Sequence, residues 1–173
     1  MALTLWFTGF SGAGKSTLAQ ALAVRLAQMG VAHKVIDGDE LRQGLCADLG
    51  FTRADRQENI RRAAEVCRLL NSAGVLTIAA LISPYRQDRA MAQQVIGHDH
   101  FKEVWLATPL QVCEERDPKG LYRKARMGEI ALFTGVSDPY EAPTAPDLSL
   151  DTQAMDVQAC VTMVLALFQK DAP

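Results

Sequence analysis

The sequence predicts an α/β fold in which helices cover both faces of a parallel sheet, giving three layers. Short apolar stretches alternate with longer segments of helical pattern, which is typical of consecutive βαβ units. The apolar stretches are almost continuously hydrophobic, as in Leu3-Thr-Leu-Trp-Phe7, so we expect strands that are buried on both faces. The candidate strands are Ala2–Thr8, Ala32–Asp37, Val75–Ile82, Phe101–Leu106 and a short one at Leu148–Leu150.

Helical patterns occupy the segments around these strands. Leucines at helical spacing follow the first strand and end at Gly30, a residue suited to a helix C-terminus. Asp55–Ser72 and Asp156–Phe168 are also predicted helices. Each begins at an aspartate that can cap the helix or offset its dipole.

Composition limits the protein class. The chain has 173 residues, a net charge of −2, 49% hydrophobic and 22% charged residues, which favours one globular domain over residues 1–173. The charge excludes a dedicated nucleic-acid binder, since no excess of cations is available to follow a phosphate backbone. The longest apolar stretch, Val75–Ile82, is too short to span a membrane. The four cysteines form no C-x-x-C pair, so a cytoplasmic protein with reduced thiols is expected.

The strongest motif is a phosphate-binding loop. Gly9-Phe-Ser-Gly-Ala-Gly-Lys15-Ser16 matches G-x-x-x-x-G-K-[ST] directly after a predicted strand and before a predicted helix. Glycines allow successive N–H groups to point at phosphate oxygens, and the helix N-terminus adds its positive dipole end. Lys15 would reach the β and γ phosphates of ATP, and the Ser16 hydroxyl would ligate Mg²⁺.

The loop alone does not distinguish between GTPases, motor ATPases and small-molecule kinases. The chain contains no Asn-Lys-x-Asp tetrapeptide to recognise guanine, and it is too short for a motor with accessory domains. A basic segment in its last third, rich in Gly and Pro, runs from Arg116 to Pro146 and is predicted to form a lid or binding loop. These features favour a nucleotide or metabolite kinase. The cations at the start of this lid are Arg116, Lys119, Arg123, Lys124 and Arg126.

Candidate acceptor residues follow the second and third strands. Asp39 lies just past the carboxyl end of a predicted parallel strand, where it can orient an attacking hydroxyl, bind its metal or cap the next helix. Arg56 and Asn59 lie one helical turn apart and could grip one ligand, although such a cluster alone is more often a solvated face. Ser83 is either a turn residue or a hydroxyl that faces the substrate. Cations near these positions predict an electropositive cleft formed by Lys15, Arg42–Arg62, Arg86–Arg89 and Arg116–Arg126.

Taken together, these motifs resemble the adenylylsulfate kinase family, whose members phosphorylate the 3′-hydroxyl of adenosine 5′-phosphosulfate (APS) with ATP. The ordered set is far more specific than the phosphate loop alone. The residues that carry the resemblance are Gly9–Thr17, Asp37–Asp39, Leu49–Phe51, Asp55–Arg62, Ile82–Arg86, Arg116–Tyr122, Phe133–Gly135 and Asp138–Glu141.

The resemblance implies a P-loop kinase fold with a five-stranded parallel core and a basic lid, usually as a homodimer, and it leaves room for an association with ATP sulfurylase. It implies an APS pocket lined by Asp39, Arg42, Phe51, Arg56, Asn59, Ile82, Ser83, Lys119, Leu132 and Phe133. It implies ATP contacts from Gly9, Ser11, Gly12, Ala13, Gly14, Lys15, Ser16 and Thr17, with Arg116 and the segment Thr152–Met155 near the ATP adenine.

The resemblance further places the adenine of APS between Phe51 and Phe133. Core packing is the simplest alternative for both rings and is the stronger one for Phe51, because Phe133 lies in a polar, glycine-flanked loop. For catalysis we expect Lys15, Asp39 and Ser83 at the reaction centre, with Asp39 orienting the hydroxyl or accepting its proton. Direct transfer needs no covalent intermediate, so Ser83 is expected to line the pocket rather than carry phosphate. A kinase for another small anionic acceptor and a non-catalytic regulatory domain are the alternative functions.

Overall fold

The computed structural model describes residues 2–170 and confirms the predicted α/β fold. Its sheet has five strands in the order β2-β3-β1-β4-β5, and every neighbouring pair is parallel. Residues 1 and 171–173 of the predicted domain lie outside the described residues. The strands are β1 (Thr4–Thr8), β2 (His33–Asp37), β3 (Leu76–Ala80), β4 (Phe101–Leu106) and β5 (Leu148–Leu150).

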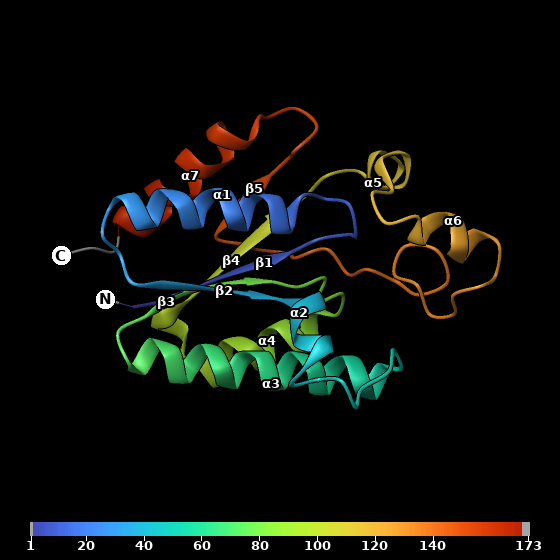
Figure 1. Cartoon of the computed structure of the whole chain (residues 1–173), viewed down its shortest axis with the longest axis horizontal. Coiled ribbons are helices and arrows are strands. Elements are labelled where there is room, and N and C mark those ends of the chain that lie inside the picture. Colours follow the sequence, from blue (N-terminus) through green and yellow to red (C-terminus); the bar gives the residue numbers. More distant parts are fainter. Residues whose placement is uncertain (1, 171–173) are drawn as a thin grey trace.

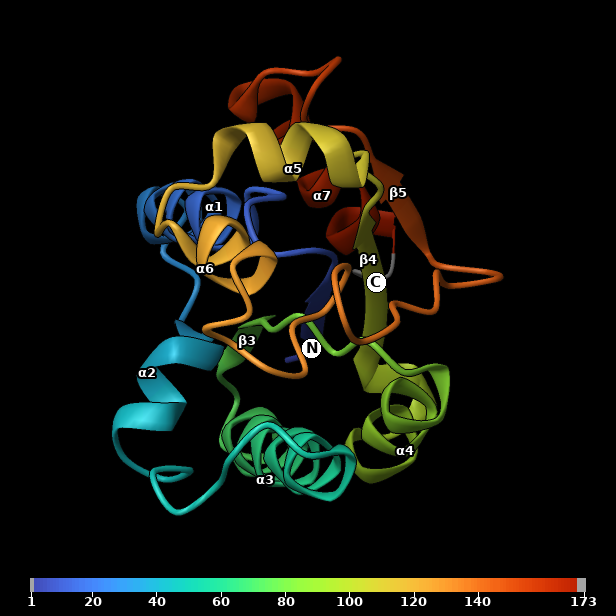
Figure 2. The same cartoon turned by 90° about the vertical axis from the view of Figure 1, so that its right-hand side faces the viewer.

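Helices cover both faces of this sheet, as Figure 1 shows. α1 and α7 lie on one face and α3 and α4 on the other, while α5 and α6 lie beyond the carboxyl ends of the strands (Figures 1 and 2). The helices are α1 (Lys15–Gln28), α2 (Gly38–Gln43), α3 (Arg53–Ser72), α4 (Arg86–Ile96), α5 (Leu110–Arg116), α6 (Leu121–Arg126) and α7 (Val157–Lys170), with a 3₁₀ turn at His98–His100.

The central strand β1 supplies side chains to both hydrophobic layers. Leu5 and Phe7 point into the core beneath α1 and α7, whereas Trp6 lies in the core beneath α3 and α4. Alternate residues of a strand face opposite sides of the sheet, so a strand that is apolar throughout is buried on both faces, as predicted. The four cysteines are buried and unbridged, which also agrees with the sequence analysis.

Helix starts differ from the prediction at two sites. Helix α3 begins before Asp55, because Thr52 caps it and Asp55 completes a capping box at the third position. Helix α2 is capped by Asp37, whose carboxylate accepts a hydrogen bond from the backbone N–H of Asp39 at 2.9 Å. The capping role considered for Asp39 is therefore wrong, and its carboxylate is left available in the first turn of α2.

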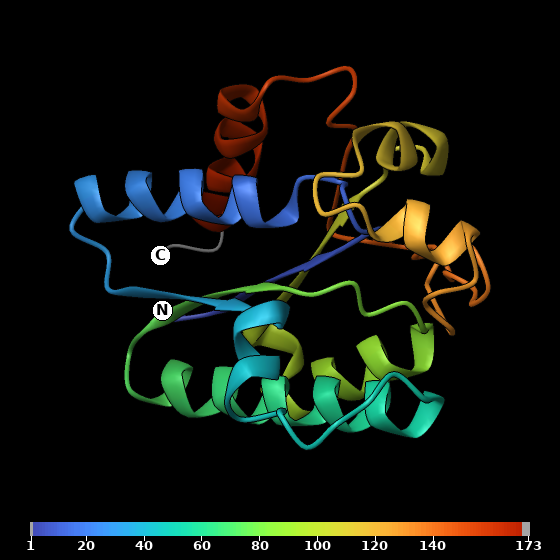
Figure 3. The ribbon, with the colours of Figure 1, turned by 45° about the vertical axis from the view of Figure 1, so that its right-hand side comes forward.

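The basic segment after α5 is not a simple loop. It contains helix α6, and α6 is followed by a turn-rich stretch that passes in front of the strand ends (Figure 3). Within residues 2–170, no helix is long and apolar enough to cross a membrane.

Candidate functional site

A cavity of about 1050 Å³ lies at the carboxyl ends of the strands, between the phosphate loop and helices α2, α3 and α6. This is the edge where ligands bind in open α/β sheets. Most of the predicted site residues line this cavity; among the predicted ATP contacts, Gly9 and Ala13 do not. Those that line it are Ser11, Gly12, Gly14, Lys15, Ser16, Thr17, Asp39, Arg42, Phe51, Arg56, Asn59, Ile82, Ser83, Arg116, Lys119, Leu132, Phe133 and Met155.

The phosphate loop needs glycine where it packs against α5. Gly12 has φ +77°, and a Cβ atom there would lie 2.8 Å from the carbonyl oxygen of Cys113. A side chain would therefore be strained and would also clash with backbone. Behind the loop, the backbone N–H of Gly9 donates to the carbonyl of Ile82 at 3.4 Å, so the loop is hydrogen-bonded to the segment that follows β3.

Lys15 is buried at the base of the loop. Its Nζ donates to the carbonyl oxygens of Gly9 and Phe10 at 2.9 and 2.7 Å. Burial lowers the pKa of Lys15 to about 8, although the nearby carboxylates of Asp37 and Asp39 act in the opposite direction. The ammonium group is thus poorly solvated and stands beside the space where the loop would hold phosphates.

The Ser16 hydroxyl donates a hydrogen bond to the carboxylate of Asp37 at 2.6 Å. A hydroxyl and a carboxylate oxygen placed side by side are ligands of the kind that Mg²⁺ prefers, so this pair fits the predicted metal. Sequence analysis named Ser16 as the metal ligand, considered a metal role for Asp39, and did not name Asp37. The available signal was an acidic residue at the carboxyl end of a predicted parallel strand, the edge of the sheet where the phosphate loop also lies.

Arg116 connects the phosphate loop to the segment after β5. Its guanidinium donates to the hydroxyl and the carbonyl of Thr152 at 2.8 and 2.9 Å, and to the carbonyl of Gly12 at 3.3 Å. The Thr152 hydroxyl donates in turn to the carbonyl of Ala13 at 2.9 Å. These contacts form one wall of the cavity, which also includes Met155. Although Ala13 does not line the cavity, its carbonyl therefore holds this wall.

On the opposite side, the ammonium group of Lys119 contacts the carboxylate of Asp39. Both side chains are more than half exposed at the cavity mouth. Arg42, also on α2, donates to the carbonyl of Gly50 at 2.9 Å and lies over the ring of Phe51 at 4.3 Å. The predicted lid thus supplies Arg116 and Lys119 to the cavity, whereas Arg123, Lys124 and Arg126 do not line it.

Arg56 and Asn59 form the floor on α3. They are 8% and 4% exposed, so the interpretation of this cluster as a solvated face is wrong. Arg56 donates to the carbonyls of Phe51, at 3.1 Å, and Leu132, and lies 3.4 Å from the carboxylate of Asp138. Among the described residues, the Asn59 Oδ1 and Thr134 Oγ1 atoms are buried without a hydrogen-bond partner, and both residues line the cavity. Orphaned polar atoms of this kind mark positions where a ligand or a water molecule can supply the missing partner.

The two phenylalanines differ in burial in the opposite sense to the prediction. Phe51 is 53% exposed, whereas Phe133 is 9% exposed and packs edge-to-face on Tyr122 with ring centroids 5.0 Å apart. Core packing therefore accounts for Phe133 and fails for Phe51. The polar surroundings of Phe133 in the sequence misled the interpretation, because helix α6 folds over its loop.

Ser83 has a strained backbone at the third predicted catalytic position. It is 2% exposed with φ +40°, and its Oγ accepts a hydrogen bond from the indole N–H of Trp6 at 3.1 Å. Arg86 and Arg89 follow in sequence but do not line the main cavity; they line a separate one. Of the cations predicted to form the cleft, five line the main cavity: Lys15, Arg42, Arg56, Arg116 and Lys119. The carboxylates of Asp37, Asp39 and Asp156 line the same cavity.

A sequence profile of the adenylylsulphate kinase family matches residues 1–151 of this chain. The chain belongs to this family. An adenylyl-sulfate kinase from Prochlorococcus marinus is 52% identical over 162 residues, covering 94% of this chain and 81% of the relative. An adenylyl-sulfate kinase from an Enterobacter species is 52% identical over 169 residues, covering 98% and 84%.

The fold agrees with this family membership. The structure of the Mycobacterium tuberculosis APS kinase CysC in complex with AMPPNP and APS superposes with a TM-score of 0.93 at 47% identity, covering 97% of this chain and 98% of that one. This relative thus shares the P-loop kinase architecture described above. The family resemblance inferred from the motifs is confirmed.

Proposed function

We propose that the protein transfers the γ-phosphoryl group of ATP to the 3′-hydroxyl of APS, giving 3′-phosphoadenosine 5′-phosphosulfate and ADP in sulfate activation. The observation that carries this proposal is that the phosphate loop and an acceptor wall with orphaned polar atoms line the same cavity. The chain that contains this cavity belongs to the adenylylsulphate kinase family. The Mycobacterium tuberculosis relative binds AMPPNP and APS, which supports two nucleotide sites in this architecture.

The ATP half would use the phosphate loop and the wall behind it. Backbone N–H groups of the loop residues that line the cavity, which are Ser11, Gly12, Gly14, Lys15, Ser16 and Thr17, suit the triphosphate together with the N-terminus of α1. Arg116, held by Thr152, and Met155 would border the adenine. Ser16 and Asp37 would hold Mg²⁺, which when bound neutralises charge on the β and γ phosphates.

The APS half would use the wall between α2, α3 and α6. The exposed face of Phe51 offers a stacking surface for adenine, and the unpartnered Asn59 Oδ1 can accept a hydrogen bond from an amino group. Arg42, Arg56 and Lys119 supply positive charge for the phosphosulfate. Ile82, Leu132 and Phe133 supply apolar surface that excludes water.

Transfer requires one bond to form and one to break. The 3′-hydroxyl oxygen of APS bonds to the γ phosphorus, the bond from that phosphorus to the β–γ bridging oxygen breaks, and ADP leaves with the electron pair. Asp39 orients the hydroxyl and accepts its proton. Lys15 and Lys119 offset the charge that develops on the transferred group and the leaving oxygen. Ser83 lines the pocket and carries no phosphate.

The proposal is tested by measuring ADP release with APS beside AMP, shikimate and gluconate as acceptors. We expect ADP formation to depend on APS, and on Mg²⁺, with the other acceptors giving no more than the background rate. ADP formation that is indifferent to APS, or far faster with another acceptor, would show that the kinase acts on a different anion. The non-catalytic alternative predicts damage at Lys15, Ser16 or Asp39, yet all three are present and line the cavity.

The homodimer, the association with ATP sulfurylase, the cytoplasmic location and the single domain over residues 1–173 stay predictions. Light scattering on the purified protein, alone and mixed with ATP sulfurylase, tests the first two. A mass of one protomer at the concentrations of the kinetic assay would contradict the homodimer.

A further inference from the structure

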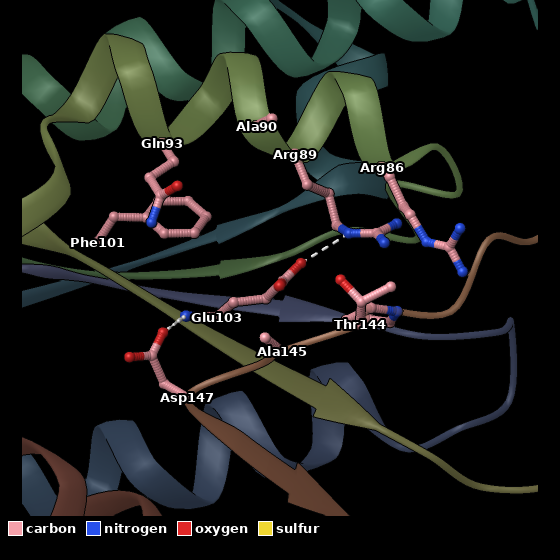
Figure 4. A pocket seen from close by; sticks show the side chains of 10 residues that line it. Arg86, Arg89, Ala90, Gln93, Phe101, Glu103, Thr144, Ala145 and Asp147 are labelled. Atoms are coloured by element: carbon pink, nitrogen blue, oxygen red, sulfur yellow. Dashed lines mark hydrogen bonds and ion pairs between the residues drawn. The ribbon is translucent and has the colours of Figure 1, made fainter.

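A second cavity, of about 240 Å³, lies beside β4 and α4, and a buried arginine forms its wall toward the main site. Figure 4 shows Arg89 reaching from α4 across this cavity to Glu103 on β4, with Gln93 one turn further along the same helix. Arg89 is only 3% exposed although it carries a full charge. Such burial is costly unless every donor of the guanidinium has a partner.

The guanidinium of Arg89 joins three separate parts of the chain. Its Nε donates to the carboxylate of Glu103 at 2.7 Å. One terminal nitrogen donates to the carbonyl of Ser83 at 2.7 Å, and the other donates to the carbonyl of Glu141, also at 2.7 Å. Since the guanidinium is planar and rigid, these acceptors are fixed relative to one another.

The part of the chain that contains Ser83 needs support. Ser83 has φ +40°, which is unfavourable for a residue with a Cβ and persists only where surrounding contacts impose it. Its side chain is fixed by Trp6 and its carbonyl by Arg89, while the preceding carbonyl, of Ile82, accepts from the hydroxyl of Thr8 at 2.8 Å. Arg89 thus holds the main chain of a residue that lines the proposed APS pocket.

The part of the chain that contains Glu141 continues from another side of the same pocket. The backbone N–H of Glu141 donates to the carbonyl of Pro84 at 2.8 Å, and the Tyr140 hydroxyl lies 2.9 Å from that of Thr8. This stretch follows Phe133 and Thr134 in the chain, both of which line the main cavity. Arg89 therefore couples the turn after β3 to the segment that follows Phe133 and Thr134.

We propose that Arg89, oriented by Glu103, is a positioning residue for the acceptor site, which sets the distance between Ser83 and the segment that follows Phe133. The inference rests on the proposed function, because it concerns the APS half of that site. Arg89 touches neither substrate; it acts through the two carbonyls that it binds.

The test is the kinetics of Arg89→Ala, with APS and ATP varied separately. We expect kcat/KM for APS to fall by about 100-fold, as for a small misplacement of substrate, with the KM for ATP changing much less. Gln93→Ala is the matched control, since Gln93 lies on the same helix and lines the same cavity but makes no hydrogen bond to Ser83 or Glu141 among the described residues. It should behave as the wild type.

The cavity allows a second measurement, rescue of Arg89→Ala by guanidinium ion, which is not expected if Arg89 only stabilises the fold. Guanidinium ion at millimolar concentration can enter the space that Arg89→Ala adds to the existing cavity and bridge the same acceptors. It should restore part of the lost kcat/KM for APS, and sodium chloride at equal ionic strength should not. Where Arg89→Ala fails to fold, Arg89→Lys decides, because it keeps a charge beside Glu103 but cannot reach three acceptors in one plane.

Two outcomes separate this inference from the proposed function. If the wild type shows no APS-dependent ADP release, the proposed function fails first. If the wild type is active and Arg89→Ala or Arg89→Lys retains wild-type kcat/KM for APS, only the positioning role is overturned. A loss for APS and ATP alike, without rescue by guanidinium, also overturns it, since it indicates general destabilisation.

Discussion

The ammonium group of Lys119 contacts the carboxylate of Asp39 across the mouth of the main cavity, joining the segment before α6 to the first turn of α2. Asp39 is thereby paired before any substrate arrives. Asp39→Asn keeps the size of the side chain but removes the proton acceptor, so kcat should fall by about 100-fold or more. Nucleotide binding should persist, because the phosphate loop is untouched.

The control for this change is Glu40→Gln, which neutralises the adjacent carboxylate on the same helix turn. Glu40 is exposed and does not line the cavity, so this variant should retain wild-type kcat. Stopped assays with saturating ATP and APS measure both variants. Equal rates for Asp39→Asn and Glu40→Gln would remove Asp39 from the chemistry.

The pKa of Lys15, lowered by burial to about 8, makes ATP binding depend on pH. Above that pH the side chain of the free protein is increasingly neutral, and a bound triphosphate raises the pKa again by its negative charge. At about pH 8.5, ATP binding should therefore be accompanied by proton uptake on Lys15, whereas at about pH 6.5 Lys15 is already protonated and should take up almost none. The affinity for ATP should fall as the pH rises past 8.

Calorimetry in two buffers of different protonation enthalpy measures this uptake. Lys15→Arg is the control, since arginine stays charged throughout the range and should remove the difference between the two pH values. Identical proton uptake by the wild type and Lys15→Arg would assign the effect to another group.

Phe51 is exposed and Phe133 is buried, so substitution of Phe51 should affect APS binding and substitution of Phe133 should affect stability. Phe51→Ala should raise the KM for APS by about 10-fold or more, because a base stacked on an aromatic ring gains about 1–3 kcal/mol. Its free energy of unfolding should change by less than about 0.5 kcal/mol, as for other exposed positions. Phe133→Ala removes a ring packed on Tyr122 and should cost about 3 kcal/mol of stability.

Urea unfolding together with the KM for APS checks both variants. Leu69→Ala serves as a control, because Leu69 is 58% exposed on α3 and does not line the cavity. It should alter neither quantity. An unchanged KM in Phe51→Ala would mean that Phe51 is exposed for a reason other than adenine binding.

Direct transfer predicts that Ser83→Ala remains active. The variant loses the Oγ that accepts from Trp6 but keeps the carbonyl held by Arg89, so turnover should fall by about 10-fold at most. Mass spectrometry of the wild type during turnover should find no phosphate on Ser83. Complete loss of activity with both substrates still bound would contradict direct transfer.

More of the fold than of the site could be predicted from the sequence. The phosphate loop and the strands were predictable, because burial on both faces of a parallel strand leaves an almost uninterrupted apolar run. Burial of Arg56 was not, since it involves Leu132 and Asp138, which lie more than seventy residues away. The pairing of Ser16 with Asp37 was not predicted either, because it requires the start of α1 to lie beside the end of β2, although β3 separates β2 from β1 in the sheet.

The residues that follow Ser83 show the same limit. Arg86 and Arg89 were grouped with the substrate cations on their sequence neighbourhood, yet α4 turns them away from the main cavity. Only the register of β4 reveals that Arg89 meets Glu103 rather than a ligand.

The phosphate loop is short in sequence, but the surfaces that shape it are distant. β1 pairs with β3 and β4, Gly12 packs on the carbonyl of Cys113, and Ala13 accepts from Thr152. A nascent chain that has emerged from the ribosome only as far as β4 holds the complete octapeptide without the walls that fix its curvature. During synthesis, nucleotide binding should thus appear late, after the residues around Thr152 have emerged, although its signature motif is among the first to be translated.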